Sequence, residues 1–290
     1  MKILFVTSNR LGDAVLSTGL LDHLIRTCPD TRFTIVCGPV AEGVFARMPN
    51  RERTIVLRKR SWGRHWLPLW ADVTLHVWDL VVDIRGSALS WLVPTRRRAV
   101  FRRIEGRKIM QLGAILDLSP PPMPVVWSSE ADQRRISDLL PIDRPIIVLA
   151  PTANWAPKVW RADRFAAAFR ILIAGLIPNA VAVVLGGTGP AERAMAAPLL
   201  AALPDAIDLV GAVSLPEAAA LLQRAALFIG NDSGLMHLSA AAGAPTIGLF
   251  GPTDAATYWP AGRCATAVAA TAMDAIAVRQ VVEAAETLLA

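Results

Sequence analysis

The sequence predicts an α/β protein with two doubly wound domains, each a parallel sheet covered by helices. Apolar runs with the length of buried strands alternate with helical stretches along all 290 residues, which is the pattern of such sheets. Two proline-containing breaks, at residues 118–124 and 141–145, divide the alternation into halves. Hydrophobic residues make up 53% of the chain and charged residues 19%, which favours sizeable cores over disorder. We therefore expect domains at residues 1–143 and 144–290.

The first domain is expected to open with a strand, a loop and a helix. The apolar run at residues 3–7 predicts a buried strand, residues 8–12 the loop, and residues 13–26 approximately the helix. The opening run is too short and too quickly followed by polar residues to be the core of a signal peptide. Further strands are expected at residues 33–37, 55–57 and 80–84.

The second domain is expected to repeat this order of elements. The expected strands are residues 146–150, 181–185, 209–211, 225–229 and 246–250, and the expected helices are residues 163–175, 190–203, 215–225, 235–242 and 274–289. The last helix, 274–290, is a candidate to pack back on the first domain. Two such domains would leave a cleft between the carboxyl ends of their strands, where α/β sheets bind ligands.

The most informative stretch is residues 228–253, which predicts an anion site. A strand ends in the polar turn 231–234, a helix follows, and Gly243 and Pro245 end that helix. The start of a helix carries unpaired N–H groups and the positive end of its dipole. Ser233 adds a hydroxyl, and Gly234 allows a ligand to approach the backbone. We expect a diphosphate to bind here.

Other candidate site residues have a functional and a structural interpretation. Asp13 follows the first strand and could be a general base, but Asp is also a favoured N-cap. Lys158, the second half's one lysine, could pair with a phosphate or simply be solvated. Glu192, beyond the turn 186–189, could accept hydrogen bonds from a ribose or complement a helix dipole. His237 lies one turn below the anion site and could instead be a packed core residue.

Several classes of site are absent from the sequence. There is no Zn²⁺ ligand spacing, no Asp-x-Asp pair, no phosphate loop of the G-x-x-x-x-G-K-[ST] type and no G-x-S-x-G elbow. We therefore expect neither a metal nor a cofactor. The three cysteines form no CxxC pair, which favours reduced thiols in the cytosol.

Basic residues are concentrated in the first half of the chain. Residues 1–145 hold 22 Lys or Arg against 14 Asp or Glu, and residues 146–290 hold 8 against 10. Such a surface suits nucleic acid, acidic lipid or a phosphorylated saccharide, unless it only keeps the protein soluble. Trp62, Trp66 and Trp70 recur at helical spacing beside these basic residues, which would suit either contact with a membrane surface or a core stripe.

These motifs together resemble the family 9 glycosyltransferases, the lipopolysaccharide heptosyltransferases. The stretch 231–254 resembles their C-terminal signature, and residues 10–13, with the Leu-Ser-Thr that follows at 16–18, resemble their N-terminal motif. Residues 151–160 are similar to their lysine loop and residues 186–192 to their ribose-contacting loop. The resemblance covers nearly the whole chain in the right order.

The resemblance implies a GT-B fold, with two facing Rossmann-like domains and a cleft between them. It implies a cytoplasmic enzyme, peripheral on the inner membrane, that transfers heptose from ADP-heptose with inversion. Its acceptor would be an anionic lipopolysaccharide-core glycolipid, and nucleic acid would not be a partner. The first domain would hold the acceptor and the second the nucleotide sugar.

The resemblance also assigns roles to the candidate residues. Asp13 would be the catalytic base, and Lys158 would stabilise the departing diphosphate. The donor would be bound by Thr152, Lys158, Glu192, Asp232, Ser233, Gly234 and His237. Two alternatives stay open at this point: a nucleotide-sugar epimerase on the same fold, and a protein that binds nucleotide sugars without catalysis.

Overall fold

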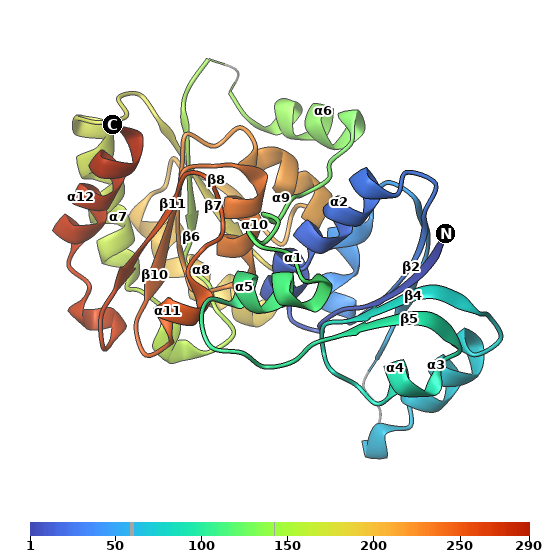
Figure 1. The fold of residues 1–290 in the computed structure, drawn as a ribbon. Coiled ribbons are helices and arrows are strands. Elements are labelled where there is room, and N and C mark those ends of the chain that lie inside the picture. The colour runs from blue at the N-terminus through green and yellow to red at the C-terminus, as the bar shows by residue number, and fades with distance from the viewer. Residues whose placement is uncertain (59–60, 142) are drawn as a thin grey trace. The chain divides into compact units, whose positions relative to one another are not determined.

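The protein consists of two compact α/β units, Met1–Trp127 and Ser128–Ala290. The structure is a computed structural model, and it describes residues 1–58, 61–141 and 143–290 (Figure 1). Within these ranges no helix combines the length and the apolar character needed to cross a membrane. Each unit has its own sheet, so the two are described separately.

The first unit contains a five-stranded parallel sheet in the order β3-β2-β1-β4-β5. The chain starts at β1, winds outward on one side, and returns to continue on the other side with β4. The order of winding therefore reverses between β1 and β4. The strands are β1 Lys2–Val6, β2 Arg32–Cys37, β3 Arg51–Val56, β4 Trp78–Asp83 and β5 Thr95–Val100.

Helices and short helical turns connect these strands. The α-helices are α1 Leu11–Leu16, α2 Thr18–Thr27, α3 Trp66–Val73, α4 Leu89–Leu92 and α5 Lys108–Gly113. The 3-10 turns are η1 Pro39–Phe45, η2 Ser61–Gly63 and η3 Ala114–Leu116. The helix expected at 13–26 begins at Leu11 instead and is divided at Ser17, whose Oγ donates to the carbonyl of Ala14 at 2.7 Å.

The second unit contains a six-stranded parallel sheet in the order β11-β10-β9-β6-β7-β8. This is the order of the dinucleotide-binding Rossmann sheet, and the winding reverses between β6 and β9. The strands are β6 Ile146–Ala150, β7 Val181–Gly186, β8 Ile207–Val210, β9 Leu227–Asn231, β10 Thr246–Phe250 and β11 Ala265–Ala269. β6 and β10 have the bounds that the sequence predicts.

The helices of the second unit are long and regular. They are α6 Glu130–Leu139, α7 Ala162–Ala174, α8 Pro190–Ala202, α9 Leu215–Leu222, α10 Gly234–Ala242, α11 Ala255–Tyr258 and α12 Val278–Leu289, with 3-10 turns η4 Ala156–Lys158 and η5 Met273–Ala275. α10 ends, as predicted, at Gly243, which has a left-handed φ of 86° that favours glycine. The expected last helix, 274–289, begins at Val278 and packs on α7 and β11 of its own unit.

The division between the units falls earlier in the chain than the break expected near residue 143. α6 begins with a capping box, in which Ser129 and Asp132 bond each other's backbone N–H groups. It then packs on α9 of the second unit, which places residues 128–141 with that unit. The proline-containing break at 141–145 therefore falls within the second unit and not between the two units.

Candidate functional site

The strongest candidate site in the second unit lies where its sheet reverses direction. β6 and β9 are neighbours in the sheet, and the chain leaves both at their carboxyl ends. The loop after β6 carries Thr152 and Lys158, and β9 ends at Asn231 immediately before Asp232 and Ser233. Open α/β sheets bind their ligands at this kind of reversal. Candidate residues 74 positions apart in the sequence meet here.

Lys158 and Asp232 form a partly buried ion pair at this position. The Lys158 Nζ lies 2.7 Å from the Asp232 Oδ2 and 3.4 Å from the Asp232 carbonyl oxygen. The side chains are 19% and 9% exposed, respectively. Water therefore screens the pair only in part, and each charge depends on the other. Sequence reasoning placed both residues at the site but did not foresee this pairing.

The loop that carries Lys158 is fixed by the tryptophan that follows it. The backbone N–H of Trp160 donates to the Asn231 Oδ1 at 3.0 Å, and its indole Nε1 donates to the Ile276 carbonyl at 3.1 Å. The indole is 1% exposed and packs edge-on against Phe165. Asn231 and Trp160 thus hold the lysine loop against the end of β9. Both lie in motifs that the sequence analysis identified, but their role depends on contacts that the sequence does not show.

The N-terminus of α10 presents polar groups at the same edge. α10 begins at Gly234, with Ser233 as an N-cap residue whose side chain makes no capping hydrogen bond. The Ser233 Oγ, the Asn231 Nδ2 and the Thr253 Oγ1 are buried atoms without a hydrogen-bond partner within residues 1–58, 61–141 and 143–290. Buried polar groups are normally satisfied. Such groups beside a helix N-terminus fit an anionic ligand with several oxygen atoms.

The other donor-site candidates lie on or near this edge of the sheet. Glu192 is in the first turn of α8, after β7, and its Oε2 accepts from the Gly187 N–H at 3.1 Å. Thr152 directly follows β6 and is 3% exposed. His237 is buried in the second turn of α10.

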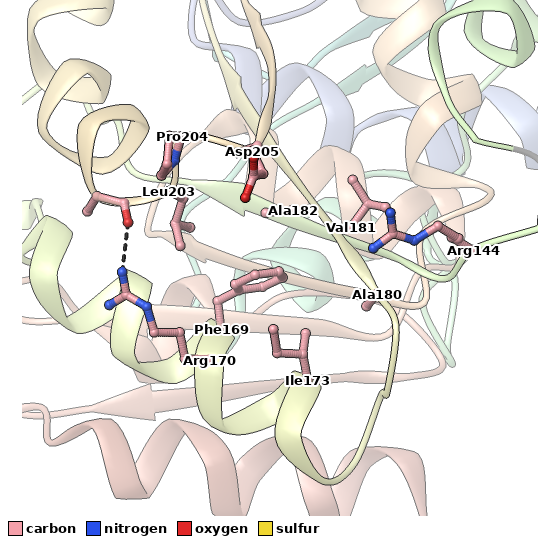
Figure 2. Close-up of a pocket in the computed structure, with 12 residues that line it drawn as sticks. Arg144, Phe169, Arg170, Ile173, Ala180, Val181, Ala182, Leu203, Pro204 and Asp205 are labelled. Atoms are coloured by element: carbon pink, nitrogen blue, oxygen red, sulfur yellow. Dashed lines mark hydrogen bonds between the residues drawn. The ribbon is translucent and has the colours of Figure 1, made fainter.

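A hollow in this unit lies at the other edge of the sheet, near the amino ends of the strands (Figure 2). It measures about 320 Å³ and is lined by Arg144, Phe169, Arg170, Ile173 and Asp205, among others. The Arg170 Nη2 donates to the Ala202 carbonyl at 2.7 Å and the Arg144 Nε to the Asn179 carbonyl at 2.9 Å. Its arginines are therefore engaged with the main chain, so this hollow is a weaker ligand site than the carboxyl edge.

The first unit has its own polar cluster at the carboxyl end of β1. Asp13 is the third residue of α1, whose N-cap is Arg10, so Asp13 is not the N-cap that the structural interpretation suggested. Its Oδ2 accepts from the Ser8 Oγ at 3.2 Å, and its side chain is half-buried. A carboxylate held by one neutral donor keeps lone pairs available for a proton.

Residues beyond β4 and β5 add positive charge to this cluster. The Arg85 Nη1 donates to the Asn9 Oδ1 at 3.4 Å, which joins the loops after β4 and β1 at the reversal of the first sheet. Lys108 starts α5, which packs on α1, and its Nζ lies 4.3 Å from the centre of the Phe101 ring. Burial lowers the pKa of Lys108, the Asp13 carboxylate acts in the opposite direction, and Arg103 lowers it further.

Arg85, Asn9 and Lys108 were not among the predicted site residues. Lys108 was considered only as part of the basic first half, which would either bind an anionic partner or keep the protein soluble. Its coupling to Asp13 arises only when α5 packs on α1. The one feature of the sequence that could have drawn attention to Lys108 is the rarity of lysine, since the chain contains only four.

Comparison with known proteins agrees with this architecture. The model of glycosyltransferase family 9 (heptosyltransferase) matches residues 90–285. The chain belongs to this family. It is 33% identical to lipopolysaccharide heptosyltransferase 3 of Escherichia coli K12, over 86% of this chain and 82% of that protein. It is 26% identical to lipooligosaccharide heptosyltransferase 2 of Haemophilus influenzae, over 87% of this chain and 84% of that protein.

The fold is shared with a solved family structure. The E. coli ADP-heptose lipopolysaccharide heptosyltransferase II superimposes with a TM-score of 0.79 at 20% identity, covering 100% of this chain and 98% of that chain. The predicted α/β fold of the GT-B class is therefore confirmed. Membership of the family makes the chain a glycosyltransferase, and the epimerase alternative is not favoured.

Proposed function

We propose that this glycosyltransferase transfers heptose from ADP-heptose, with inversion, to a lipopolysaccharide-core or related anionic glycolipid acceptor. The names of its relatives, which are lipopolysaccharide and lipooligosaccharide heptosyltransferases, support this choice of donor and acceptor. The observation that carries the donor half is the Lys158–Asp232 pair, placed next to the N-terminus of α10 at the reversal of the second sheet.

In this proposal the second unit binds the nucleotide sugar. The diphosphate accepts hydrogen bonds from the first N–H groups of α10 and from the Ser233 hydroxyl, and Gly234 gives it close access to the backbone. Lys158 neutralises charge that develops on the departing ADP, while Asp232 contacts the sugar. Glu192 accepts from ribose hydroxyls, and Thr152 and His237 line the site.

Asp13 of the first unit is the proposed base. It takes the proton of an acceptor hydroxyl as that oxygen forms a bond to the anomeric carbon. The bond from that carbon to the diphosphate oxygen breaks in the same displacement, so ADP leaves with the electron pair and the sugar inverts. General-base assistance of this kind contributes about 10²–10⁴-fold to the rate. No metal ion or cofactor takes part in this scheme.

The charge of the first unit supports the proposed acceptor and location. Residues 1–127 hold 19 Lys or Arg against 10 Asp or Glu, which suits a phosphorylated glycolipid. We propose that the enzyme works in the cytoplasm and contacts the inner-membrane surface where such an acceptor would lie.

A ligand screen followed by a transfer assay tests this function. ADP and ADP-heptose are expected to raise the melting temperature more than UDP, GDP and their sugars, because a ligand that binds only the folded state stabilises it. ADP release is then expected only when a lipopolysaccharide-core acceptor is added. Turnover of the nucleotide sugar without acceptor would instead support an epimerase, and binding without turnover a non-catalytic role.

A further inference from the structure

An exposed apolar surface covers α3 and α4 of the first unit. We call it the α3–α4 surface. Its members are Leu67 and Trp70 of α3, Trp91 and Leu92 of α4, and Trp62 and Leu75, which flank α3 in the chain. Trp62 is 97% exposed and Trp91 62% exposed. The two helices contact each other, and the Trp70 Nε1 donates to the Leu92 carbonyl at 3.2 Å, so they form one surface (Figure 1). Exposed patches of this kind mark interaction sites.

The inner face of the same helices is already occupied by the core. Leu69 and Val73 of α3 pack with Leu89 of α4 in one buried cluster. Trp66, the middle member of the expected tryptophan stripe, packs against this cluster, with the Arg85 guanidinium 5.0 Å from the centre of its ring. Other side chains of these helices therefore supply the core contacts, and the outer apolar side chains are additional to the core.

Polar residues do not cover the outer face as they do on an ordinary surface helix. The only charged residue of α3 is Asp72, and it pairs with Arg53 at 2.8 Å. α4 has the sequence Leu-Ser-Trp-Leu, and its serine is buried. A helix that is apolar on both faces needs a second apolar environment.

Arginines border this surface. Arg96 and Arg98 of β5, the edge strand of the sheet, are exposed and lie on the same face of that strand, whereas Arg97 points to the other face. The Arg98 Nε donates to the Ser90 carbonyl at 2.8 Å, and its guanidinium lies 6.0 Å from the centre of the Trp91 ring. Residues 58–108 together hold twelve Lys or Arg against four Asp or Glu. Exposed tryptophans bordered by basic residues match the boundary between anionic headgroups and acyl chains.

We propose that the α3–α4 surface docks on an anionic lipid bilayer, with Trp62 and Trp91 entering the interface and the arginines contacting headgroup phosphates. This inference rests on the proposed function, since it places the enzyme where a glycolipid acceptor lies. A lipid surface fits better than a second copy of the chain, because an isologous interface would bring the same arginines together. The docking is peripheral, through side chains on one side of the first unit.

Vesicle co-sedimentation tests the proposal without any substrate. The wild-type chain is expected to bind vesicles of phosphatidylcholine with 30 mol% phosphatidylglycerol at least tenfold more tightly than pure phosphatidylcholine at about 0.1 M salt, and to be released as salt screens the charges. The double variant Trp62→Ala/Trp91→Ala is expected to lose at least tenfold in affinity for anionic vesicles. Arg64 lies between Trp62 and Trp66 in the sequence, and Arg96 lies on the same face of β5 as Arg98. Arg64→Glu/Arg96→Glu is expected to lose at least about twentyfold, since each basic residue near the surface contributes roughly fivefold.

The matched control removes two exposed apolar side chains from the second unit. Ile171→Ala/Leu176→Ala changes residues that are 49% and 38% exposed, and it is expected to leave vesicle binding unchanged. Equal binding by the tryptophan variant, or no binding by the wild-type chain, would overturn the proposal. A wild-type dimer that the tryptophan variant loses, without vesicle binding by either, would assign the surface to self-association instead. The ADP-induced rise in melting temperature, measured on the same proteins in solution, reports the donor site separately.

Discussion

Removing the Lys158 amine is the sharpest test of the donor site, because this one group has two partners in the scheme. Without ligand it neutralises Asp232 at 2.7 Å, and with ADP bound it is expected to contact the diphosphate as well. Lys158→Ala therefore leaves one buried carboxylate uncompensated and removes one charge-assisted hydrogen bond to the ligand. The two consequences can be measured independently.

The stability cost follows from the burial of the pair. Breaking a buried ion pair by removing one partner costs about 3–5 kcal/mol. Asp232 is 9% exposed but Lys158 is 19% exposed, so water can enter the gap and the low end, about 3 kcal/mol, is expected. For a unit of this size each kcal/mol lowers the melting temperature by about 2–4 °C, so Lys158→Ala should lower it by roughly 6–12 °C.

The binding cost follows from the lost hydrogen bond. A hydrogen bond to a charged group contributes about 1.5–3 kcal/mol, so the Kd for ADP should rise by about 10- to 100-fold in Lys158→Ala. The Asp232→Asn variant should do the opposite, because it frees Lys158 and removes a negative charge beside the diphosphate. Its ADP affinity should rise a few-fold while its rate of sugar transfer falls.

Calorimetric titration with ADP and thermal unfolding of both variants give these quantities. The double variant Lys158→Ala/Asp232→Ala serves as the control, since it should recover part of the lost melting temperature by removing the unpaired carboxylate. An unchanged Kd for ADP in Lys158→Ala, with the melting temperature lowered, would mean that the lysine serves the fold alone. In that case the assignment of this edge as the diphosphate site would fail.

Three further predictions concern Asp13, Lys108 and the cysteines. Asp13→Asn should lower the transfer rate by about 10²–10⁴-fold while ADP binding, by calorimetry, stays unchanged; an active variant would remove Asp13 as the base. Lys108→Met should lower kcat/KM for the acceptor by roughly tenfold. Because burial lowers the pKa of Lys108 from its ordinary 10.5, the wild-type rate should fall as rising pH deprotonates this amine, and the pH–rate profile of the variant should lack that limb. Burial, and secondarily Glu42, raise the pKa of the Cys37 thiol to about 12. Maleimide at pH 8 should therefore label the exposed Cys264 and spare Cys37 until the chain unfolds. Mass spectrometry of the labelled peptides would show which cysteine has reacted.

The sequence predicted strands best where both faces of the sheet are covered. β6 and β10 are buried along their whole length, so they read as continuous apolar runs with clear ends. β5 was missed because it is an edge strand whose three central residues are exposed arginines. β11 was missed because its alternation of alanine, threonine and valine has little apolar bulk. Both missed strands lie at the edge of a sheet, and the position of a strand in its sheet cannot be read from a local sequence pattern.

The sequence predicted which loops carry the residues of the candidate site, but it did not predict which of these residues contact each other. Lys158 and Asp232 were each identified from their position after a strand, yet their pairing requires that β6 and β9 be neighbours. Strand order is a long-range property, and an alternating α/β sequence is compatible with several orders. The same limit applies to Lys108, whose relation to Asp13 depends on how α5 packs on α1.

The two units have the same winding order around their first strand but differ in charge, and this difference bears on the division of labour. Residues 128–290 hold 11 Lys or Arg against 14 Asp or Glu, and Lys158 is the one lysine among them. In the proposed scheme, the diphosphate is bound there by that lysine and by the backbone of α10, so single substitutions at Lys158 are expected to have large effects. The first unit spreads its excess positive charge over many arginines. Loss of any one of them should weaken binding of an anionic acceptor only slightly, since the remaining charges act at similar range through the solvent.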